Sequence, residues 1–259
     1  MKKSVIAIAA AVLALSFTAA GCKSKKVVEV NSAADLAGLT IGVQAGTTGE
    51  LYVQEEVKDA KIKSFKTGID AALALGNGAI DAIVLDELPA KEIVRRNPSL
   101  AIVNDKFSAE EYAIAVRKGN PELLARINAT IARVMSDGTY DSLVSAFMPV
   151  DGNITIPNVE ELEAAPVLRM GTNAAFPPFE YVDGTEVVGF DVTLAKMIAN
   201  DYGRKLQVSD MAFDSLIAAL QSGSIDFIAA GMTATDERRK NVDFSEPYYK
   251  TNQVIIIRK

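Results

Sequence analysis

Two points of the sequence place a polar side chain where a small charged group could bind. Thr48 stands at the start of an expected helix, 48–57, where its hydroxyl and the backbone N–H groups can donate to an anion. Asp86 comes directly after the apolar run 80–85, at the carboxyl end of an expected strand, which is where α/β sheets bind ligands. Alternatively, Asp86 caps the helix 87–96, a common role for aspartate.

Arg238 is a third candidate for binding a charged group. A planar guanidinium suits a carboxylate better than an ammonium group does, because two parallel hydrogen bonds can form. Considered without any resemblance, however, its neighbours Glu237 and Arg239 favour a solvated surface cation at this position.

The composition excludes several kinds of chemistry. Histidine is absent and Cys22 is the single cysteine, which rules out Ser-His-Asp and Cys-His catalysis, internal disulfides, and histidine or multi-cysteine metal sites. The formal net charge is −6, and the chain has no long basic run beyond 23–26. We therefore expect no metal, no cofactor and no nucleic-acid partner.

From residue 39 onward, short apolar runs rich in β-branched residues alternate with amphipathic helical patterns. This alternation is typical of βαβ units, so the sequence predicts an α/β fold with largely parallel sheets. The expected strands are 39–43, 62–65, 80–85, 112–116, 167–171, 205–208, 225–229 and 253–257. The expected helices are 48–57, 68–75, 87–96, one that starts at Pro121 and ends before Gly138, 140–147, 191–201, 214–221 and 236–240.

The pattern is lost over residues 150–166, which are rich in turn formers and acidic residues and are expected to form a linker. The parts of the chain before and after this linker share a sequence pattern. IDAALALGNGAIDAIVLD and FDSLIAALQSGSIDFIAAG each place a helix before a glycine, Gly78 or Gly223, and then an Ile-Asp pair that opens a strand. Either any helix-to-strand junction uses glycine in this way, or the chain forms two similar lobes with a ligand in the crevice between them.

Longer blocks of sequence extend this pattern to a known family. GTNAAFPPFEY (171–181), GFDVTLAKMIA (189–199), the block 213–239 and FSEPYY (244–249) resemble the first lobe of polar amino-acid periplasmic binding proteins, which feed ABC importers. GLTIGVQAGTTGELY (38–52), GAIDAIVLD (78–86) and YAIAVRKGN (112–120) resemble that family's second lobe and its return crossover. The resemblance implies a two-lobe, periplasmic-binding-protein-like (type II) fold with a hinge.

The blocks stand in the reverse of the family's order, so the resemblance implies a circular permutation. The expected parts are family lobe 2 at 31–112, an interlobe crossover at 113–116, C-terminal helices of lobe 1 at 117–149, the linker 150–166 that joins the family's old termini, and the main part of lobe 1 at 167–259. This arrangement predicts one covalent crossover between the lobes instead of two. Pairing of residues 27–30 with 253–257 would restore the second crossover without a covalent link.

The first residues resemble a lipoprotein signal peptide. Two lysines precede a short apolar run and the Ala19-Ala20-Gly21-Cys22 sequence, so we expect cleavage of residues 1–21 and lipid attachment at Cys22. An ordinary cleaved signal with an incidental cysteine is the alternative. The expected location is periplasmic or cell-surface, anchored to the membrane, and the expected state is a monomer.

The resemblance also assigns a ligand site. It places the amino-acid carboxylate on Arg238 and the ammonium on Asp86, with further polar contacts from both lobes and aromatic rings beside the ligand side chain. The site residues that it implies are Gln44, Thr47, Thr48, Asp86, Asn173, Phe176, Phe213, Gly231, Met232, Thr233 and Arg238.

The ligand and the function then follow as expectations. Gln44 and the turn after it resemble arginine-binding members of the family, whereas Asn173 replaces an aspartate of some basic-amino-acid binders. We expect arginine or lysine, with glutamine or another polar amino acid as the alternative, delivered to an ABC transporter permease by hinge closure. The protein is not expected to be an enzyme; a cyclohexadienyl or arogenate dehydratase-like activity with Glu180 as the acid, and a sensor domain, are the alternatives of other classes.

Overall fold

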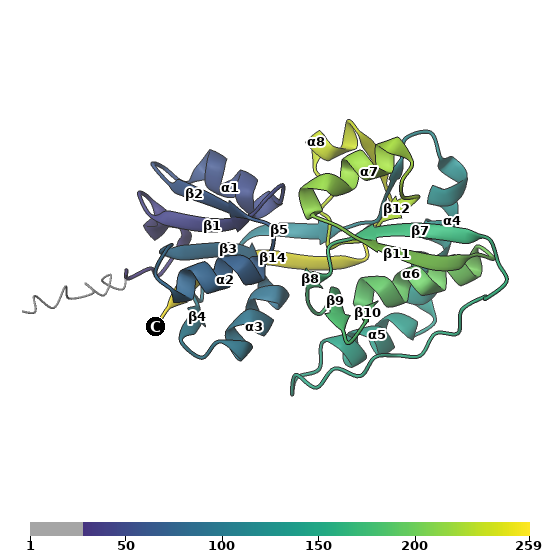
Figure 1. Cartoon of the computed structure of the whole chain (residues 1–259), viewed down its shortest axis with the longest axis horizontal. Helices are drawn as coiled ribbons and strands as arrows, with labels where there is room; N and C mark the ends of the chain where they lie inside the picture. Colours follow the sequence, from purple (N-terminus) through teal and green to yellow (C-terminus); the bar gives the residue numbers. More distant parts are fainter. Residues whose placement is uncertain (1–27) are drawn as a thin grey trace, which may run out of the picture.

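The computed structural model describes residues 28–259 and divides them into two lobes, each built on its own sheet (Figure 1). The expected signal peptide and lipid-attachment residue Cys22 lie outside the described residues. One sheet has the strand order β2-β1-β3-β14-β4, with β5 paired to β14, and the other has the order β11-β7-β12-β6-β13. We call the lobe around the first sheet the N-lobe and the lobe around the second sheet the C-lobe. The expected α/β class and two-lobe architecture are confirmed.

The N-lobe sheet is covered on both faces because its central strands are apolar throughout. Alternate residues of β3 (Ala82–Asp86) belong to two cores: Ile83 and Leu85 pack toward α2 (Gly68–Gly76) and α3 (Glu87–Arg96), and Ala82 and Val84 pack toward α1 (Thr48–Glu56). The remaining N-lobe elements are η1 (Ala33–Leu36), β1 (Thr40–Gln44), β2 (Lys61–Phe65), β4 (Leu100–Ile102) and the last strand, β14 (Tyr249–Arg258).

The C-lobe sheet is likewise covered on both faces. One core joins α4 (Pro121–Ser136), α5 (Thr139–Phe147) and α6 (Phe190–Asp201) to the sheet, and the other joins it to α7 (Leu216–Ser222). The strands are β6 (Ala115–Arg117), β7 (Val167–Thr172), β11 (Lys205–Asp210), β12 (Phe227–Ile228) and β13 (Val242–Phe244), and the short helices are η2 (Phe213–Ser215) and α8 (Asp236–Arg239). Residues 150–166 contain no helix or strand.

The repeated glycine and Ile-Asp pattern of the sequence forms the same local structure in both lobes. The aspartates of the two Ile-Asp pairs, Asp81 and Asp226, each accept a backbone N–H at the start of the neighbouring parallel strand, from Thr40 at 2.9 Å and from Arg169 at 2.8 Å. The glycine before each pair adopts a positive φ, +71° at Gly78 and +79° at Gly223. The two strand orders also correspond one to one, with three parallel strands followed by two antiparallel partners in each lobe.

Two covalent segments cross between the lobes, so the prediction of a single crossover is wrong. The first is β5 (Phe107–Tyr112), which continues into β6 of the C-lobe. The second is the segment from β13 into β14, whose first half pairs with β5 and whose second half lies between β3 and β4 of the N-lobe. Residues 253–258 therefore belong to the N-lobe and not to the lobe that contains 167–252.

The proposed pairing of residues 28–30 with β14 is also wrong. β14 is an inner strand with β3 on one side and β4 and β5 on the other, so neither of its edges is open to a further strand. Residues 28–30 carry no strand, although Val30 is buried in the N-lobe core beside α1.

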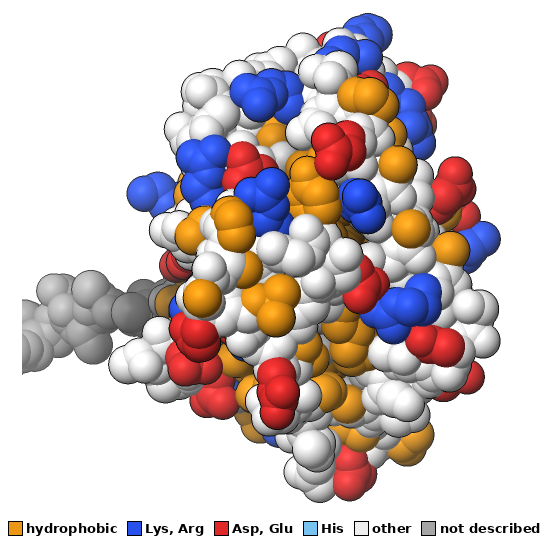
Figure 2. Space-filling model, turned by 90° about the vertical axis from the view of Figure 1, so that its right-hand side faces the viewer, with side chains coloured by type: hydrophobic (Ala, Val, Ile, Leu, Met, Phe, Trp, Pro, Cys, Tyr) orange, Lys and Arg blue, Asp and Glu red, His pale blue; other side chains and the backbone are white. Residues whose placement is uncertain are grey.

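The structure also contains a small sheet that the sequence did not predict. A small sheet, β8 (Ala175–Phe176), β9 (Glu180–Asp183) and β10 (Glu186–Val188), connects β7 to α6. Within residues 28–259, no helix has the length and apolar character needed to cross a bilayer. At the end of the C-lobe, basic and acidic side chains are interspersed and do not gather by sign (Figure 2).

Candidate binding cleft

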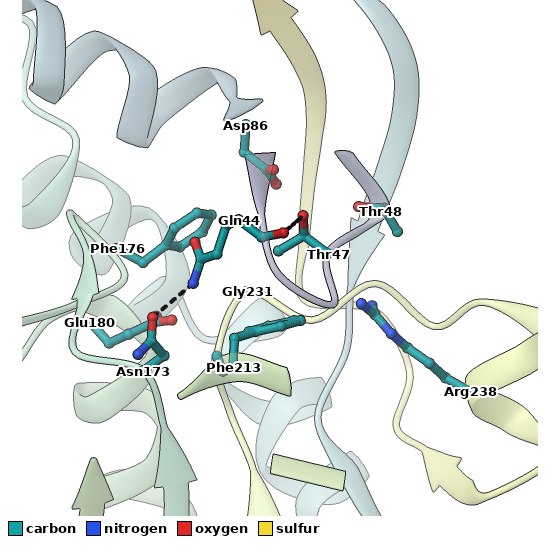
Figure 3. A pocket seen from close by; sticks show the side chains of 11 residues that line it. Gln44, Thr47, Thr48, Asp86, Asn173, Phe176, Glu180, Phe213, Gly231 and Arg238 are labelled. Atoms are coloured by element: carbon teal, nitrogen blue, oxygen red, sulfur yellow. Dashed lines mark hydrogen bonds between the residues drawn. The ribbon is translucent and has the colours of Figure 1, made fainter. Parts of the chain in front are cut away.

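The candidate site is a cleft between the two lobes, at the carboxyl ends of parallel strands in both sheets (Figure 3). Gln44 ends β1 and Asp86 ends β3 on the N-lobe side. Asn173 follows β7, and Ala230 closely follows β12, on the C-lobe side. The residues that line the cleft, around a narrow space that is partly open to solvent, are Gln44, Thr47, Thr48, Asp86, Asn173, Phe176, Glu180, Phe213, Ala230, Gly231 and Arg238.

The structure brings together all of the predicted site residues except Met232 and Thr233. The Met232 side chain is 1% exposed and packs in the C-lobe core, and its carbonyl accepts from the backbone N–H of Ala113 at 3.0 Å. Thr233 lies behind the cleft, where its hydroxyl donates to Glu110 at 2.6 Å. Neither side chain lines the cleft, because both are held by neighbouring elements of the fold.

Arg238 is buried, with 8% of its surface exposed, which excludes the alternative of a solvated cation. Its guanidinium donates to the carbonyl of Thr233 at 2.7 Å and, across the cleft, to the carbonyl of Gly46 at 2.9 Å. It also lies 5.3 Å from the centre of the Phe213 ring. Burial lowers the pKa of Arg238, and the nearby carboxylates of Glu110 and Asp86 oppose this change. Three of the five guanidinium N–H groups make no bond to these two carbonyls.

Asp86 is buried at the end of β3 and makes no side-chain cap bond to α3, so the capping alternative is wrong. Its carboxylate accepts instead from the hydroxyl of Tyr112 and from the amide of Gln253 at 2.6 Å. Burial raises the pKa of Asp86, and the neighbouring carboxylate of Glu110 raises it further. A cation beside this group would stabilise its charged form.

Glu110, on β5, is a part of the site that the sequence did not predict. One of its carboxylate oxygens accepts from the hydroxyl of Thr48 at 2.9 Å, from the N-lobe, and from that of Thr233, in the C-lobe. Its other oxygen accepts from Gln253 at 2.9 Å. Glu110 therefore joins the two lobes through Thr48 and Thr233. The available signal was the strand alternation of FSAEEY, which places Glu110 on the same face as the buried Tyr112.

The aromatic residues Phe176 and Phe213 both face the cleft and are 8% and 9% exposed (Figure 3). Phe176 packs closely over Gly231, whose φ is +53° and where an added Cβ would approach the Phe176 ring to 2.7 Å. A glycine is required at this position because both the backbone conformation and the ring exclude a side chain. The nitrogen of Gly231 donates to Asp191 at 2.9 Å, which fixes this edge of the cleft.

The two lobes also contact each other through Gln44 and Asn173. The Gln44 amide donates to Asn173 at 2.9 Å (Figure 3). The Asn173 amide donates in turn to the carbonyl of Met211 at 2.8 Å. Together with the bond from Arg238 to Gly46, this contact holds the lobes against each other on both sides of the cleft.

Glu180 lines the cleft and was expected only as the acid of the alternative enzyme function. It is 0% exposed, and neither of its carboxyl oxygens has a hydrogen-bond donor among the described residues. Burial raises the pKa of Glu180 well above its ordinary value, and Asp191 adds to this effect. In the part of the chain that the structure describes, no group of three or more His, Cys, Asp or Glu side chains is arranged to hold a metal ion.

Comparison with known proteins identifies relatives of the C-terminal part of the chain. Residues 168–259 match the family of bacterial extracellular solute-binding proteins, family 3. The arginine-binding extracellular protein ArtP of Bacillus subtilis is 51% identical over 92 residues, and a probable histidine-binding protein of Campylobacter jejuni is 42% identical over 89 residues. These matches cover 36% and 34% of this chain and 36% and 35% of the relatives, so the chain spans about a third of the length of the curated relatives that it matches.

Solved structures match over a similar share. The holo arginine-binding protein of T. maritima is 52% identical and covers 32% of this chain and 37% of that chain, with a TM-score of 0.32. An ancestral arginine-binding protein bound to glutamine is 55% identical, with the same coverage of both chains and the same TM-score. The similarity to the bacterial extracellular solute-binding proteins, family 3, therefore covers residues 168–259 of this chain.

Proposed function

We propose that this protein binds a basic amino acid, arginine or lysine, in the interlobe cleft and delivers it to an ABC importer. The observation that carries this proposal is the balance of charge. The cleft is lined by one basic residue, Arg238, and by two acidic residues, Asp86 and Glu180, and Glu110 stands directly behind it. A ligand with one carboxylate and two cationic groups compensates such a site better than a neutral zwitterion does.

Each group of the ligand has a partner of suitable chemistry. The free N–H groups of Arg238 suit the carboxylate, and Asp86 suits the ammonium group. Phe176 and Phe213 offer ring faces to the ligand side chain, since a guanidinium or the stem of a lysine packs well on aromatic rings. Glu180 lies on the other side of the cleft from Arg238 in Figure 3, where the far end of such a side chain would reach it.

Delivery would depend on closure of the lobes. The ligand partners come from both lobes, so the ligand binds the closed arrangement more tightly than an open one and shifts the equilibrium toward it. The names of the relatives, among them an ABC transporter arginine-binding protein of Escherichia coli, support a transporter permease as the partner. A location outside the cytoplasm, with a lipid anchor at Cys22, belongs to the same proposal.

A thermal-shift screen of the twenty amino acids tests the proposed function. Arginine or lysine at a hundred times its dissociation constant should stabilise the folded protein by about 2.7 kcal/mol. No shift with any amino acid would refute the proposal. A shift with glutamine but not with arginine or lysine would favour the neutral alternative, to which the glutamine-bound ancestral relative lends support.

The enzyme alternative rests on Glu180, because a buried carboxylic acid that keeps its proton can act as a general acid. One structure relative is described as a precursor of cyclohexadienyl dehydratase. We propose binding without turnover, because the cleft offers partners for each group of an amino acid. Incubation of the purified protein with prephenate or arogenate, followed by chromatography, should show no product above background.

We also propose that the order of the lobes is a circular permutation of the family's order. Both ends of the described chain lie in the N-lobe: Val30 packs in its core, and the Lys259 nitrogen donates to the carbonyl of Ser99 at 2.9 Å. A rearranged gene that joins residue 259 to residue 31 through a short linker and opens the chain within 150–166 should fold and bind the same ligand. Loss of folding in that rearranged protein would count against the permutation.

A further inference from the structure

Two buried carboxyl groups meet at the side of the cleft away from Arg238. Glu180, on β9, and Asp191, in the first turn of α6, are both 0% exposed. The backbone N–H of Asp191 donates at 2.9 Å to the carbonyl of Phe179, the residue before Glu180, and the charge of Asp191 acts on the pKa of Glu180. Asp191 Oδ2 accepts from the nitrogen of Gly231 at 2.9 Å and from the hydroxyl of Tyr248 at 2.6 Å. Asp191 Oδ1 and both Glu180 oxygens have no donor among the described residues. One proton between the two carboxyl groups supplies the missing donor.

Among the described residues, the charged groups that act most strongly on this pair are acidic or phenolic. Asp86 at the end of β3 and Asp210 at the end of β11 act on Glu180, and Tyr248, before β14, donates to Asp191. The one basic residue that lines the cleft, Arg238, bonds to carbonyls on the other side. The surroundings therefore disfavour a second negative charge on the pair, and a cation that reached Glu180 would reverse this preference.

We propose that Glu180 and Asp191 share one proton in the unliganded cleft, and that a cationic ligand side chain displaces this proton into solvent when it binds beside Glu180. This inference rests on the proposed function. The positive charge of the ligand takes the place of the proton, so the net charge on this side of the cleft is unchanged. A neutral side chain leaves the proton in place and receives a hydrogen bond from the carboxyl group. Asp191 is thus a positioning residue that sets the charge of Glu180 without touching the ligand.

The pKa values agree with this arrangement. Burial raises the pKa of Asp191 to about 6, against the bonds from Tyr248 and Gly231, which favour its charged form. Burial and the charge of Asp191 raise the pKa of Glu180 well above its ordinary value. At neutral pH the pair then holds one proton, mainly on Glu180. A ligand that requires the charged form of Glu180 binds more weakly as the pH falls, because it must displace a proton that is held more firmly.

Calorimetry with arginine and citrulline tests the proposal on the unmodified protein, since citrulline has nearly the shape of arginine and no side-chain charge. Each ligand is titrated at pH 7 in two buffers with different ionisation enthalpies, which gives the number of protons released. Arginine should release up to about one proton more than citrulline, and its affinity should fall by up to about tenfold per pH unit below pH 7. Binding of both ligands with equal proton release would overturn the inference and leave the proposed function intact. Binding of neither would overturn both.

Two variants separate the shared proton from a merely structural role. In Glu180→Gln the extra proton release should disappear, with weaker binding of arginine and unchanged or tighter binding of citrulline. In Asp191→Asn the new amide can still accept from Gly231 and can donate to Glu180, and the negative charge of Asp191 is gone, so Glu180 should hold its proton less firmly although it stays buried. Arginine should then bind with less extra proton release than it does in the wild type. Proton release in either folded variant equal to that of the wild type would contradict the assignment, and the wild-type comparison stands by itself if a variant does not fold.

Discussion

Replacement of Arg238 by alanine should lower the affinity for arginine by about 30-fold to several thousand-fold, which corresponds to about 2–5 kcal/mol. The range follows from burial. Arg238 is 8% exposed and donates two hydrogen bonds of 2.7 and 2.9 Å, so a carboxylate bound to its remaining N–H groups would lie in the same desolvated place. Removing one partner of a buried pair leaves the other charge without compensation, which costs more than the loss of a surface ion pair.

The neighbouring residue provides a matched control. Arg239 belongs to the same short helix, carries the same charge and is exposed, with its guanidinium over the ring of Phe244. Arg239→Ala therefore changes the net charge equally and should change the affinity by less than about threefold, as expected for a surface position. A third variant, Arg238→Lys, keeps the charge but loses the planar fork and should give an intermediate loss.

Isothermal titration with arginine measures the three affinities, and thermal melting without ligand shows that each variant is folded. Arg238 also bonds to the Gly46 carbonyl across the cleft, so part of the loss in Arg238→Ala will arise from weaker contact between the lobes. This part also appears in the melting temperature of the unliganded variant, whereas the lost ligand contact does not. A loss of affinity below threefold in folded Arg238→Ala would refute the assignment of Arg238 to the ligand carboxylate.

The remaining predictions concern three other positions of the cleft. Glu180→Gln should melt at a higher temperature than the wild type at pH 7, and at nearly the same temperature at about pH 4. The reason is that burial raises the pKa of Glu180, so at pH 7 the folded chain must keep a proton that the unfolded chain loses. Equal melting curves at pH 7 would contradict a buried Glu180 carboxyl that keeps its proton. Gly231→Ala should destabilise the fold by about 2–4 kcal/mol, since the new methyl group meets the ring of Phe176. The control Gly184→Ala, at a glycine with a φ of +61° and open space around it, should cost only about 1 kcal/mol. Chemical denaturation measures both losses, and equal losses would show that the Phe176 ring is not the cause. Asp86→Asn should weaken arginine binding by about 10-fold to 100-fold, because the ligand ammonium group loses a charged partner. Titration calorimetry measures this affinity, and an unchanged value would show that Asp86 does not bind the ligand.

Much of the fold could be predicted from the spacing of apolar residues. The helix 87–96 and the starts of α1, α2 and α4 agree with the expected residues. The starts of α1, α2 and α4 each follow a residue whose side chain caps the helix, and α4 also begins with a proline. The repeated Gly…Ile-Asp pattern predicted two similar lobes, since a positive φ at the glycine and a bonded aspartate at the strand start impose the same local structure twice.

The hinge could not be predicted in the same way. The first half of β14 contains Lys250, Thr251 and Asn252, which lack the apolar run of a buried strand. These residues form a strand because they pair with β5 between the lobes, and this pairing is a tertiary contact across more than half of the chain. A strand that begins at Tyr249 reaches the N-lobe sheet by itself, so the chain crosses twice where a single crossover was expected.

The buried acids show a similar limit. Asp86 could be found because an apolar strand leads directly to it. Glu110 follows an exposed stretch and precedes another glutamate, so its sequence resembles a solvated edge. Its burial arises from Thr48, Thr233 and Gln253, which come from three other parts of the chain. Hydrogen bonds from distant segments are not visible in the sequence, so the strand alternation that places Glu110 on the same face as Tyr112 was the available signal of its burial.

A crystal structure of the protein grown with L-arginine tests the proposed binding of a basic amino acid most directly. We expect the ligand carboxylate on the guanidinium of Arg238, the ammonium within hydrogen-bond distance of Asp86, and the side chain between Phe176 and Phe213 with its guanidinium on Glu180. Arginine bound outside the interlobe cleft, or with its carboxylate directed at Glu180, would contradict the proposed function.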